Sequence, residues 1–190
     1  MTGFWLVSYI ALWILVIALG ALLLLLYRHF GMMSLGTLEG VQRDGLSLGA
    51  EAPAISGITA DGNDATWQPK SGSYQMLLFA SPDCEPCSAI MPFAQQLANA
   101  KTNVKVASVV QGPKTEVVRM VDKHHPSFQT LADDGSGAFP RFQVRVTPFG
   151  FVIGPDGRVL AKGLCSDPAR MRMLLQSAGL QDAAAAIQTA

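Results

Sequence analysis

The stretch Ser81-Pro82-Asp83-Cys84-Glu85-Pro86-Cys87 decides the fold of this chain. It follows an apolar run, residues 74–80, that is typical of a buried strand, and it precedes a segment with helical spacing. The two cysteines are therefore predicted where a strand gives way to a helix. Because a helix N-terminus stabilises anions, we expect Cys84 to be the attacking thiolate. Cys87, about one turn later, is expected to be the resolving thiol that releases a partner bound to Cys84.

Two other interpretations of the cysteine pair are a structural disulfide and half of a zinc site. Zinc in proteins usually takes four ligands, which requires a second Cys or His pair. The remaining candidates are Cys165, His29, His124 and His125, and they form no second CxxC or HxxxH spacing. The strand and helix on either side favour redox chemistry, so we expect no metal and no cofactor beyond the cysteines themselves.

The net charge of the 190-residue chain is zero, because 14 basic residues balance 14 acidic ones. Charge therefore favours neither nucleic acid nor an acidic partner. Residues 3–27 contain no charged side chain, and at about 1.5 Å per residue they can cross roughly 30 Å of hydrocarbon. A cleavable signal peptide would have a shorter apolar region, a basic residue before it and a small-residue cleavage site after it. We therefore predict an uncleaved transmembrane anchor over residues 1–28.

The evidence on membrane orientation conflicts. Arg28 and His29 flank the C-terminal end of the apolar stretch, and this positive charge alone would place the large domain in the cytoplasm. A redox-active CxxC domain is instead typical of the space where protein disulfides are made and edited, outside the cytoplasm. We predict the second arrangement: a single-pass helix in the inner cell membrane and a periplasmic domain over residues 49–180, with a linker at 29–48 and a tail at 181–190.

Strand and helix patterns alternate within the predicted domain, which indicates an α/β fold. Turn residues occupy 61–64, and the Ala-rich tail has helix propensity with little to anchor it. A short helix or loop is expected over 135–142. The expected strands are 74–80, 104–110, 128–131 and a hairpin within 146–161, and the expected helices are 84–100, 114–124 and 167–179.

This order of elements, with Thr147-Pro148 ahead of the terminal hairpin, resembles the thioredoxin fold over residues 49–179. The resemblance implies a mixed sheet flanked by helices, with a cis peptide bond before Pro148 beside the cysteine pair. Proline has no N–H, so the backbone before it would remain open to an extended substrate strand. Thr147 and Pro148 are therefore the expected substrate-binding residues.

The predicted anchor, residues 49–55 and the Cys-Glu-Pro-Cys core resemble the anchored, extracytoplasmic TlpA-like proteins. More narrowly, residues 79–84, 144–150 and 161–164 are similar to the MauD family. MauD is the methylamine utilization protein needed to mature the disulfide-rich small subunit of methylamine dehydrogenase. The resemblance implies a thiol-disulfide oxidoreductase, acting as reductase or isomerase, with that subunit as its client and a membrane or thioredoxin-like protein as its electron donor.

Three positions depart from the family pattern. Leu78 and Ile90 stand where many relatives carry an acid, and Asp83 stands where an aromatic residue usually precedes the first cysteine. The negative charges of Asp83 and Glu85 would raise the pKa of a nearby thiol. We therefore expect Cys84 to be less acidic than in a strong oxidant, and the pair to have a more reducing or isomerising poise.

Two other function classes fit parts of the sequence. A thiol peroxidase of the AhpC/TSA type would share the opening at 49–55, but it typically carries Thr-x-x-Cys, and here Pro82 lies two residues before Cys84. A copper-binding metallochaperone on the same fold usually has CxxxC spacing, which is absent. Cys165 is expected to be a passive, partly buried thiol unless the fold brings it close to Cys84.

Overall fold

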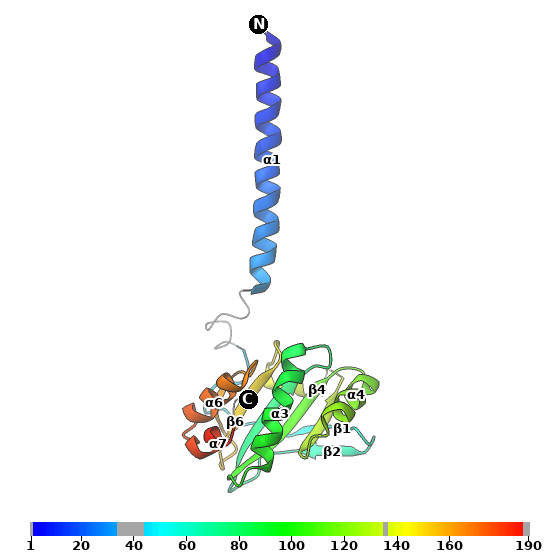
Figure 1. Ribbon diagram of the computed structural model, residues 1–190, viewed down its shortest axis with the longest axis vertical. Coiled ribbons are helices and arrows are strands. Elements are labelled where there is room, and N and C mark those ends of the chain that lie inside the picture. The colour runs from blue at the N-terminus through cyan, green and yellow to red at the C-terminus, as the bar shows by residue number, and fades with distance from the viewer. Residues whose placement is uncertain (1, 34–43, 135–136, 188–190) are drawn as a thin grey trace. The chain divides into compact units, whose positions relative to one another are not determined.

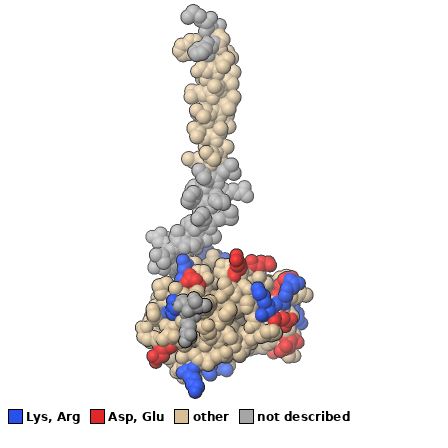
Figure 2. Space-filling view, in the orientation of Figure 1, with Lys and Arg blue, Asp and Glu red and all other residues tan. Residues whose placement is uncertain are grey.

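The computed structural model describes residues 2–33, 44–134 and 137–187. The chain divides into two compact units, Met1–Val41 and Gln42–Ala190. The first unit contains one long helix, α1 (Thr2–Met33). Its segment Trp5–Leu24 is long and apolar enough to cross a membrane, with a mean hydropathy of 2.6. Figure 2 shows no acidic or basic side chain along the coloured part of this helix.

The second unit is built on one seven-stranded mixed sheet with the order β2-β1-β5-β4-β3-β6-β7. Strand β3 lies near the middle, parallel to β4 and antiparallel to β6. Six of its seven residues are buried, as expected for a central strand covered on both faces. The strands are β1 (Ile55–Thr59), β2 (Asp64–Trp67), β3 (Tyr74–Ala80), β4 (Val104–Gln111), β5 (Gln129–Asp133), β6 (Phe149–Ile153) and β7 (Val159–Leu164).

Four helices pack on one face of this sheet, and the second face is covered by aromatic side chains. Figure 1 shows α3 in front of the strands. Apolar residues of α3, α6 and α7 share one buried cluster, while α4 joins α3 in another. On the second face, the Phe79 ring lies 5.0 Å from that of Phe139 and 5.1 Å from that of Phe142. The helices are α3 (Glu85–Asn99), α4 (Lys114–His124), α5 (Ala138–Phe142), α6 (Pro168–Ser177) and α7 (Gln181–Ala185). The predicted α/β class is confirmed.

Two elements were not expected from the sequence. The hairpin β1–β2 surrounds the predicted turn at 61–64, but alternate residues of β1 are exposed and Gly57 interrupts it. A Cβ on Gly57 would lie 2.9 Å from the carbonyl oxygen of Ala132, so the close strand pairing requires glycine here. The tail forms α7, which is anchored because Ala183, Ala184 and Ile187 are buried in the core.

The expected linker, residues 29–48, overlaps both units. Its first residues belong to α1, and residues 34–43 lie outside the described part of the chain. Leu48, at the end of this stretch, is 63% exposed, whereas Asp44 is buried and only 4% exposed. Gly45 is also buried, and its N–H donates to the carbonyl of Gln143 at 2.9 Å. The proposed domain boundary at residue 49 stays a prediction.

Candidate active site

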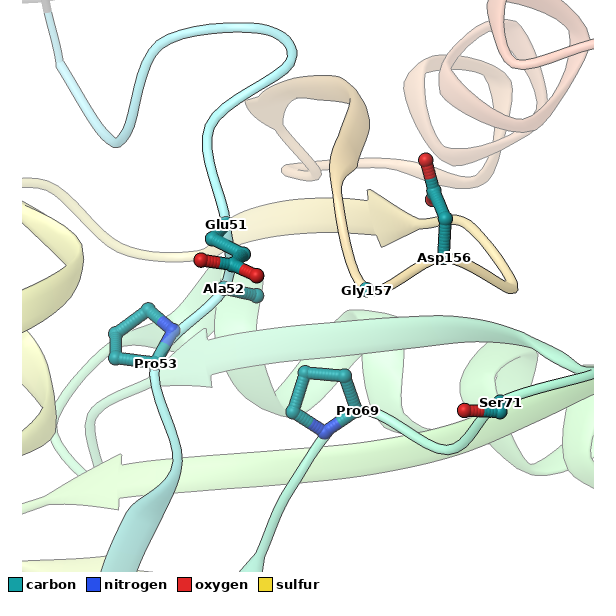
Figure 3. A pocket seen from close by; sticks show the side chains of 7 residues that line it. All are labelled: Glu51, Ala52, Pro53, Pro69, Ser71, Asp156 and Gly157. Carbon is teal, nitrogen blue, oxygen red and sulfur yellow. The ribbon is translucent and has the colours of Figure 1, made fainter.

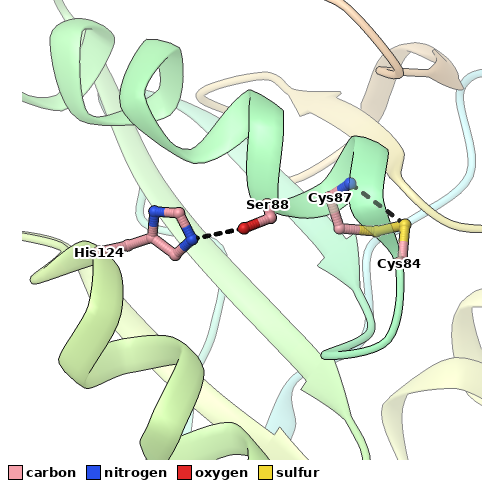
Figure 4. The surroundings of a disulfide bond; sticks show 4 residues. All are labelled: Cys84, Cys87, Ser88 and His124. Atoms are coloured by element: carbon pink, nitrogen blue, oxygen red, sulfur yellow. Dashed lines mark hydrogen bonds between the residues drawn. A yellow bond between two sulfur atoms is a disulfide. The ribbon is translucent and has the colours of Figure 1, made fainter.

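The two cysteines of the CxxC stretch form a disulfide where β3 gives way to α3 (Figure 4). The S–S distance is 2.07 Å and the two Cα atoms are 5.1 Å apart. Cys84 is the N-cap residue of α3, and its sulfur accepts a hydrogen bond from the N–H of Cys87 at 3.2 Å. Pro86 lies in the first turn, where a missing N–H costs no helical hydrogen bond. The local sequence therefore places a sulfur at the positively polarised end of a helix.

The two sulfurs differ in access to solvent. Cys87 is fully buried in a cluster that also contains Met91 of α3 and apolar residues of α4, whereas Cys84 is only half-buried. An incoming disulfide can therefore reach Cys84 before Cys87. This difference agrees with the predicted roles of Cys84 as nucleophile and Cys87 as resolving thiol.

The loop before β6 lies beside the cysteine-bearing end of β3. The peptide bond between Thr147 and Pro148 is cis. Because Phe149 pairs with Phe79, the antiparallel register places Pro148 next to Ala80, four residues before Cys84. In the described chain, no hydrogen bond occupies the backbone N–H or carbonyl of Thr147. This backbone is therefore available to a visiting strand.

The loop before β6 is held in place by residues that are distant from it in the sequence. The carboxylate of Asp44 accepts hydrogen bonds from the backbone N–H of Arg145 at 3.1 Å and from its Nε at 2.9 Å. The ammonium of Lys162 donates to the carbonyls of Asp44 and Gly45. Burial lowers the pKa of Lys162, and the charge of Asp44 opposes that shift. This brace of Asp44, Arg145 and Lys162 could not be predicted from the sequence, because Asp44 lies in a glycine-rich stretch with no periodic pattern.

Cys165 is a free thiol sealed in the core. It is 0% exposed, and burial raises its pKa to about 12, with a further contribution from the charge of Asp167. Its backbone N–H donates to the carbonyl of Pro148 at 3.0 Å, and its sulfur lies close to Gly150. At neutral pH this group stays a protonated thiol, so its visible contribution is to packing beneath the Thr147–Pro148 loop.

A polar contact joins α3 to the end of α4 next to the cysteines. Nε2 of His124 lies 2.7 Å from the hydroxyl oxygen of Ser88 (Figure 4). The Lys123 ammonium donates to the same oxygen at 3.1 Å. Desolvation lowers the pKa of His124, and the charge of Lys123 lowers it further. The sequence placed His124 at a helix end but gave no signal for its partner.

The two positions where many relatives carry acids are apolar and buried. Leu78 is 1% exposed and Ile90 is 2% exposed. Asp83 and Glu85, on the other hand, are exposed beside the disulfide. The helix terminus and the Cys87 N–H can stabilise a Cys84 thiolate, while the carboxylates of Asp83 and Glu85 oppose it.

A hollow of about 410 Å³ lies at the opposite end of the sheet from the disulfide. It is bordered by Glu51 on the entry segment, Ser71 ahead of β3, and Asp156 in the turn between β6 and β7 (Figure 3). Strand register separates it from the cysteines, because Ile153 pairs with Gln75 at the start of β3. This hollow is therefore not part of the cysteine site.

Comparison with known protein families agrees with this geometry. Residues 47–176 match the Redoxin family. The chain belongs to the Redoxin family. With its Cys84–Cys87 pair at disulfide distance in CxxC spacing, this Redoxin is a thiol-disulfide oxidoreductase.

Curated relatives of this Redoxin include two proteins named "Methylamine utilization protein MauD". The one from Methylophilus methylotrophus is 28% identical, over 93% of this chain and 85% of the relative. The one from Methylobacillus flagellatus is 27% identical, over 93% of this chain and 87% of the relative. The predicted resemblance to MauD is confirmed.

Solved structures confirm the thioredoxin-like fold. A thiol:disulfide interchange protein DsbE from Chlorobium tepidum matches with a TM-score of 0.64 at 22% identity, over 73% of this chain and 99% of that one. The thioredoxin domain of a thiol-disulfide oxidoreductase from Bacteroides vulgatus matches with a TM-score of 0.57 at 22% identity, over 63% of this chain and 89% of that one.

Proposed function

We propose that this Redoxin is a membrane-anchored reductase or isomerase of disulfides in a protein outside the cytoplasm. The observation that carries the proposal is the disulfide at the N-terminus of α3, with Cys84 the more accessible sulfur. Cys84 acts as the nucleophile and Cys87 as the resolving thiol. An extended segment of the client binds at Thr147 and Pro148, where free backbone groups lie beside the end of β3.

The reaction begins with both cysteines reduced. The thiolate of Cys84 attacks one sulfur of the client disulfide, a mixed disulfide forms, and the other client sulfur leaves as a thiolate that takes up a proton. The thiolate of Cys87 then attacks the sulfur of Cys84, which releases the second client thiol. Two electrons have passed to the client, and the Cys84–Cys87 disulfide remains. Reshuffling results when a client thiol attacks the mixed disulfide before Cys87 does.

The electrostatics of the site support the reducing direction. A strong oxidant stabilises its reduced form by lowering the pKa of the first cysteine. Here Asp83 and Glu85 are exposed beside Cys84, and their negative charges oppose that lowering. We therefore expect electrons to flow from an upstream membrane or thioredoxin-like donor, through the cysteine pair, to the client.

The client and the location follow from the family resemblance. Similarity to proteins named MauD extends over 93% of this chain. We propose the small subunit of methylamine dehydrogenase, or a protein with a similar density of disulfides, as the client. We also propose that α1 is a single-pass anchor in the inner membrane and that the domain lies in the periplasm, although Arg28 alone would favour the reverse orientation.

The proposed function is tested by trapping the client on full-length Cys87→Ser protein. Without the resolving thiol, the mixed disulfide at Cys84 should persist as a band that reductant removes, and mass spectrometry should identify the client. Cys165→Ser is the matched control, because it also removes one cysteine and should leave turnover intact. Failure of Cys87→Ser to capture any disulfide-bearing protein, while glutathione still reacts with Cys84, would contradict the proposed client chemistry.

Orientation is tested separately by labelling Cys84 in the Cys87→Ser variant with a membrane-impermeant thiol reagent. Cys165 is buried and should not react in folded protein. Labelling of intact spheroplasts is expected if the domain lies in the periplasm. Labelling only after permeabilisation would place the domain in the cytoplasm.

A further inference from the structure

The end of α4 is tied to the first turn of α3 by side chains that have no part in the disulfide exchange described above. Ser88 directly follows Cys87, and its backbone N–H donates to the carbonyl of Cys84 at 3.1 Å. Its hydroxyl oxygen lies 2.7 Å from Nε2 of His124 (Figure 4) and also accepts from the Lys123 ammonium at 3.1 Å. One residue thus closes the first turn of α3 through its backbone and ties that turn to α4 through its side chain.

We propose that Ser88 and His124 form a latch that positions the first turn of α3 and thereby determines how well Cys84 is held as a thiolate. The proposal rests on the proposed role of Cys84 as nucleophile. The Cys87 N–H reaches the Cys84 sulfur at 3.2 Å only while this turn keeps its helical form. In the described residues, neither side chain of the latch has a hydrogen bond to a sulfur, so both are positioning residues.

A neutral His124 fits the donors and acceptors of the latch. A lysine ammonium can only donate, so the Ser88 oxygen accepts from Lys123. The hydroxyl hydrogen of Ser88 is then available to Nε2 of His124, which accepts it when the imidazole is uncharged. Burial and the charge of Lys123 both lower the pKa of His124, which supports the uncharged form at neutral pH.

A second contact provides a matched comparison. Gln95, about two turns further along α3, donates from Nε2 to the Ser127 hydroxyl at 2.6 Å and accepts from the Ser127 backbone N–H at 2.8 Å. The Ser127 hydroxyl also donates to Asn99 at 3.0 Å. This contact ties the same helix to the segment after α4, but far from the cysteines. Breaking it should loosen packing without changing the first turn.

The test uses the full-length, detergent-solubilised protein and the variants Ser88→Ala, His124→Phe, His124→Gln and Ser127→Ala. Two quantities are measured: the pKa of Cys84 from thiolate absorbance, and the equilibrium constant with glutathione at a pH where Cys84 is ionised. Ser88→Ala and His124→Phe should each lower the acid dissociation constant of Cys84 about three- to tenfold, as expected when the thiolate loses one hydrogen bond. The pair then becomes more reducing by about 15–30 mV.

Two further results are expected if the residues act together. His124→Gln, whose amide can still meet the Ser88 hydroxyl, should stay closer to the unmodified protein than His124→Phe does. The double variant Ser88→Ala with His124→Phe should be no more affected than either single change, because both remove the same contact.

Unchanged Cys84 pKa and glutathione equilibrium in both latch variants would overturn the proposal. A shift of equal size in Ser127→Ala would also overturn it, because general loosening of α3 would then explain the effect. Both measurements are independent of any client. Loss of client trapping by Cys87→Ser would therefore contradict the proposed function while leaving the latch to be judged on its own results.

Discussion

The close approach of β6 to the buried free thiol predicts a large effect of Gly150→Ala. A Cβ on Gly150 would lie 2.6 Å from the sulfur of Cys165, 2.9 Å from Cε of Met76 and 3.1 Å from Cδ2 of Leu174. Nonbonded heavy atoms normally approach to about 3.5–4.0 Å, so the contact with sulfur overlaps by about 1 Å. Overpacking of this kind costs about 1–3 kcal/mol. Replacing glycine by alanine also reduces the conformational entropy of the unfolded chain, and this offsets about 0.4–1 kcal/mol of that cost.

We therefore expect Gly150→Ala to lower the free energy of unfolding by about 1–2 kcal/mol. The matched control is Gly163→Ala, on the neighbouring strand and paired directly with Gly150. Its nearest side-chain atom would be Cδ1 of Leu174, at 3.8 Å, which is ordinary contact. This control should be neutral or slightly stabilising. Urea unfolding of the full-length protein in detergent, followed by circular dichroism, measures both variants.

A double-mutant cycle assigns the cost to the sulfur. Cys165→Ala removes the closest clashing atom, so it should recover about 1 kcal/mol when combined with Gly150→Ala. Recovery is incomplete because Met76 and Leu174 remain close. The reasoning is refuted if Gly150→Ala is as stable as Gly163→Ala, or if the effects of Gly150→Ala and Cys165→Ala simply add.

Three further predictions concern other charged or buried groups. In the folded state the pKa of His124 lies below its usual value of 6.5, so on acidification the unfolded chain takes up a proton at this residue before the folded protein does. The free energy of unfolding should therefore fall as pH drops below 6.5, and it should fall less in His124→Gln. Asp44→Ala should lower the free energy of unfolding by about 2–3 kcal/mol, because it leaves the Arg145 backbone N–H without its charged acceptor. Cys165, with a pKa of about 12, should react with thiol reagents only after unfolding, whereas reduced Cys84 should react in the folded protein.

Each of these predictions has a clear contrary outcome. Superimposable stability profiles of the unmodified protein and His124→Gln between neutral and mildly acidic pH would contradict the first. Asp44→Asn is the control for the second, since its amide oxygen can still accept from Arg145; equal stability of Asp44→Ala and the unmodified protein would refute it. Labelling of Cys165 at the rate of Cys84 under native conditions would refute the third.

Features with a local signal could be predicted from the sequence. The apolar run of β3 and the helical spacing of α3 locate the cysteines at a strand end and a helix start, because both patterns depend on neighbouring residues. Asp167 is another local signal: an aspartate directly before Pro168 is typical of a helix N-cap, and its carboxylate accepts from the Arg170 N–H at 2.9 Å. The family resemblance contributed the position of the Thr147–Pro148 loop.

Features that depend on distant contacts could not be predicted. Asp44 and Arg145 are 101 residues apart in the sequence, and Ser88 and His124 are 36 apart. Neither pair belongs to a motif, since their meeting depends on how the sheet orders its strands and where α4 ends. The tail helix α7 was likewise uncertain, because an alanine-rich segment gains its stability from the core it packs on rather than from its own propensity.

The bond between Asp44 and Arg145 has a practical consequence for any soluble fragment of this protein. A truncation that begins at residue 49, where the sequence alone suggests a start, discards both the carboxylate that grips Arg145 and the carbonyls that Lys162 holds. The backbone at Thr147 and Pro148, where the client is proposed to bind, would then lose the contact that holds Arg145, three residues before Pro148. Slow disulfide exchange by such a fragment would result from the loss of the Asp44 contacts rather than from the loss of the membrane helix. A fragment that starts before Asp44 should therefore exchange disulfides at the normal rate.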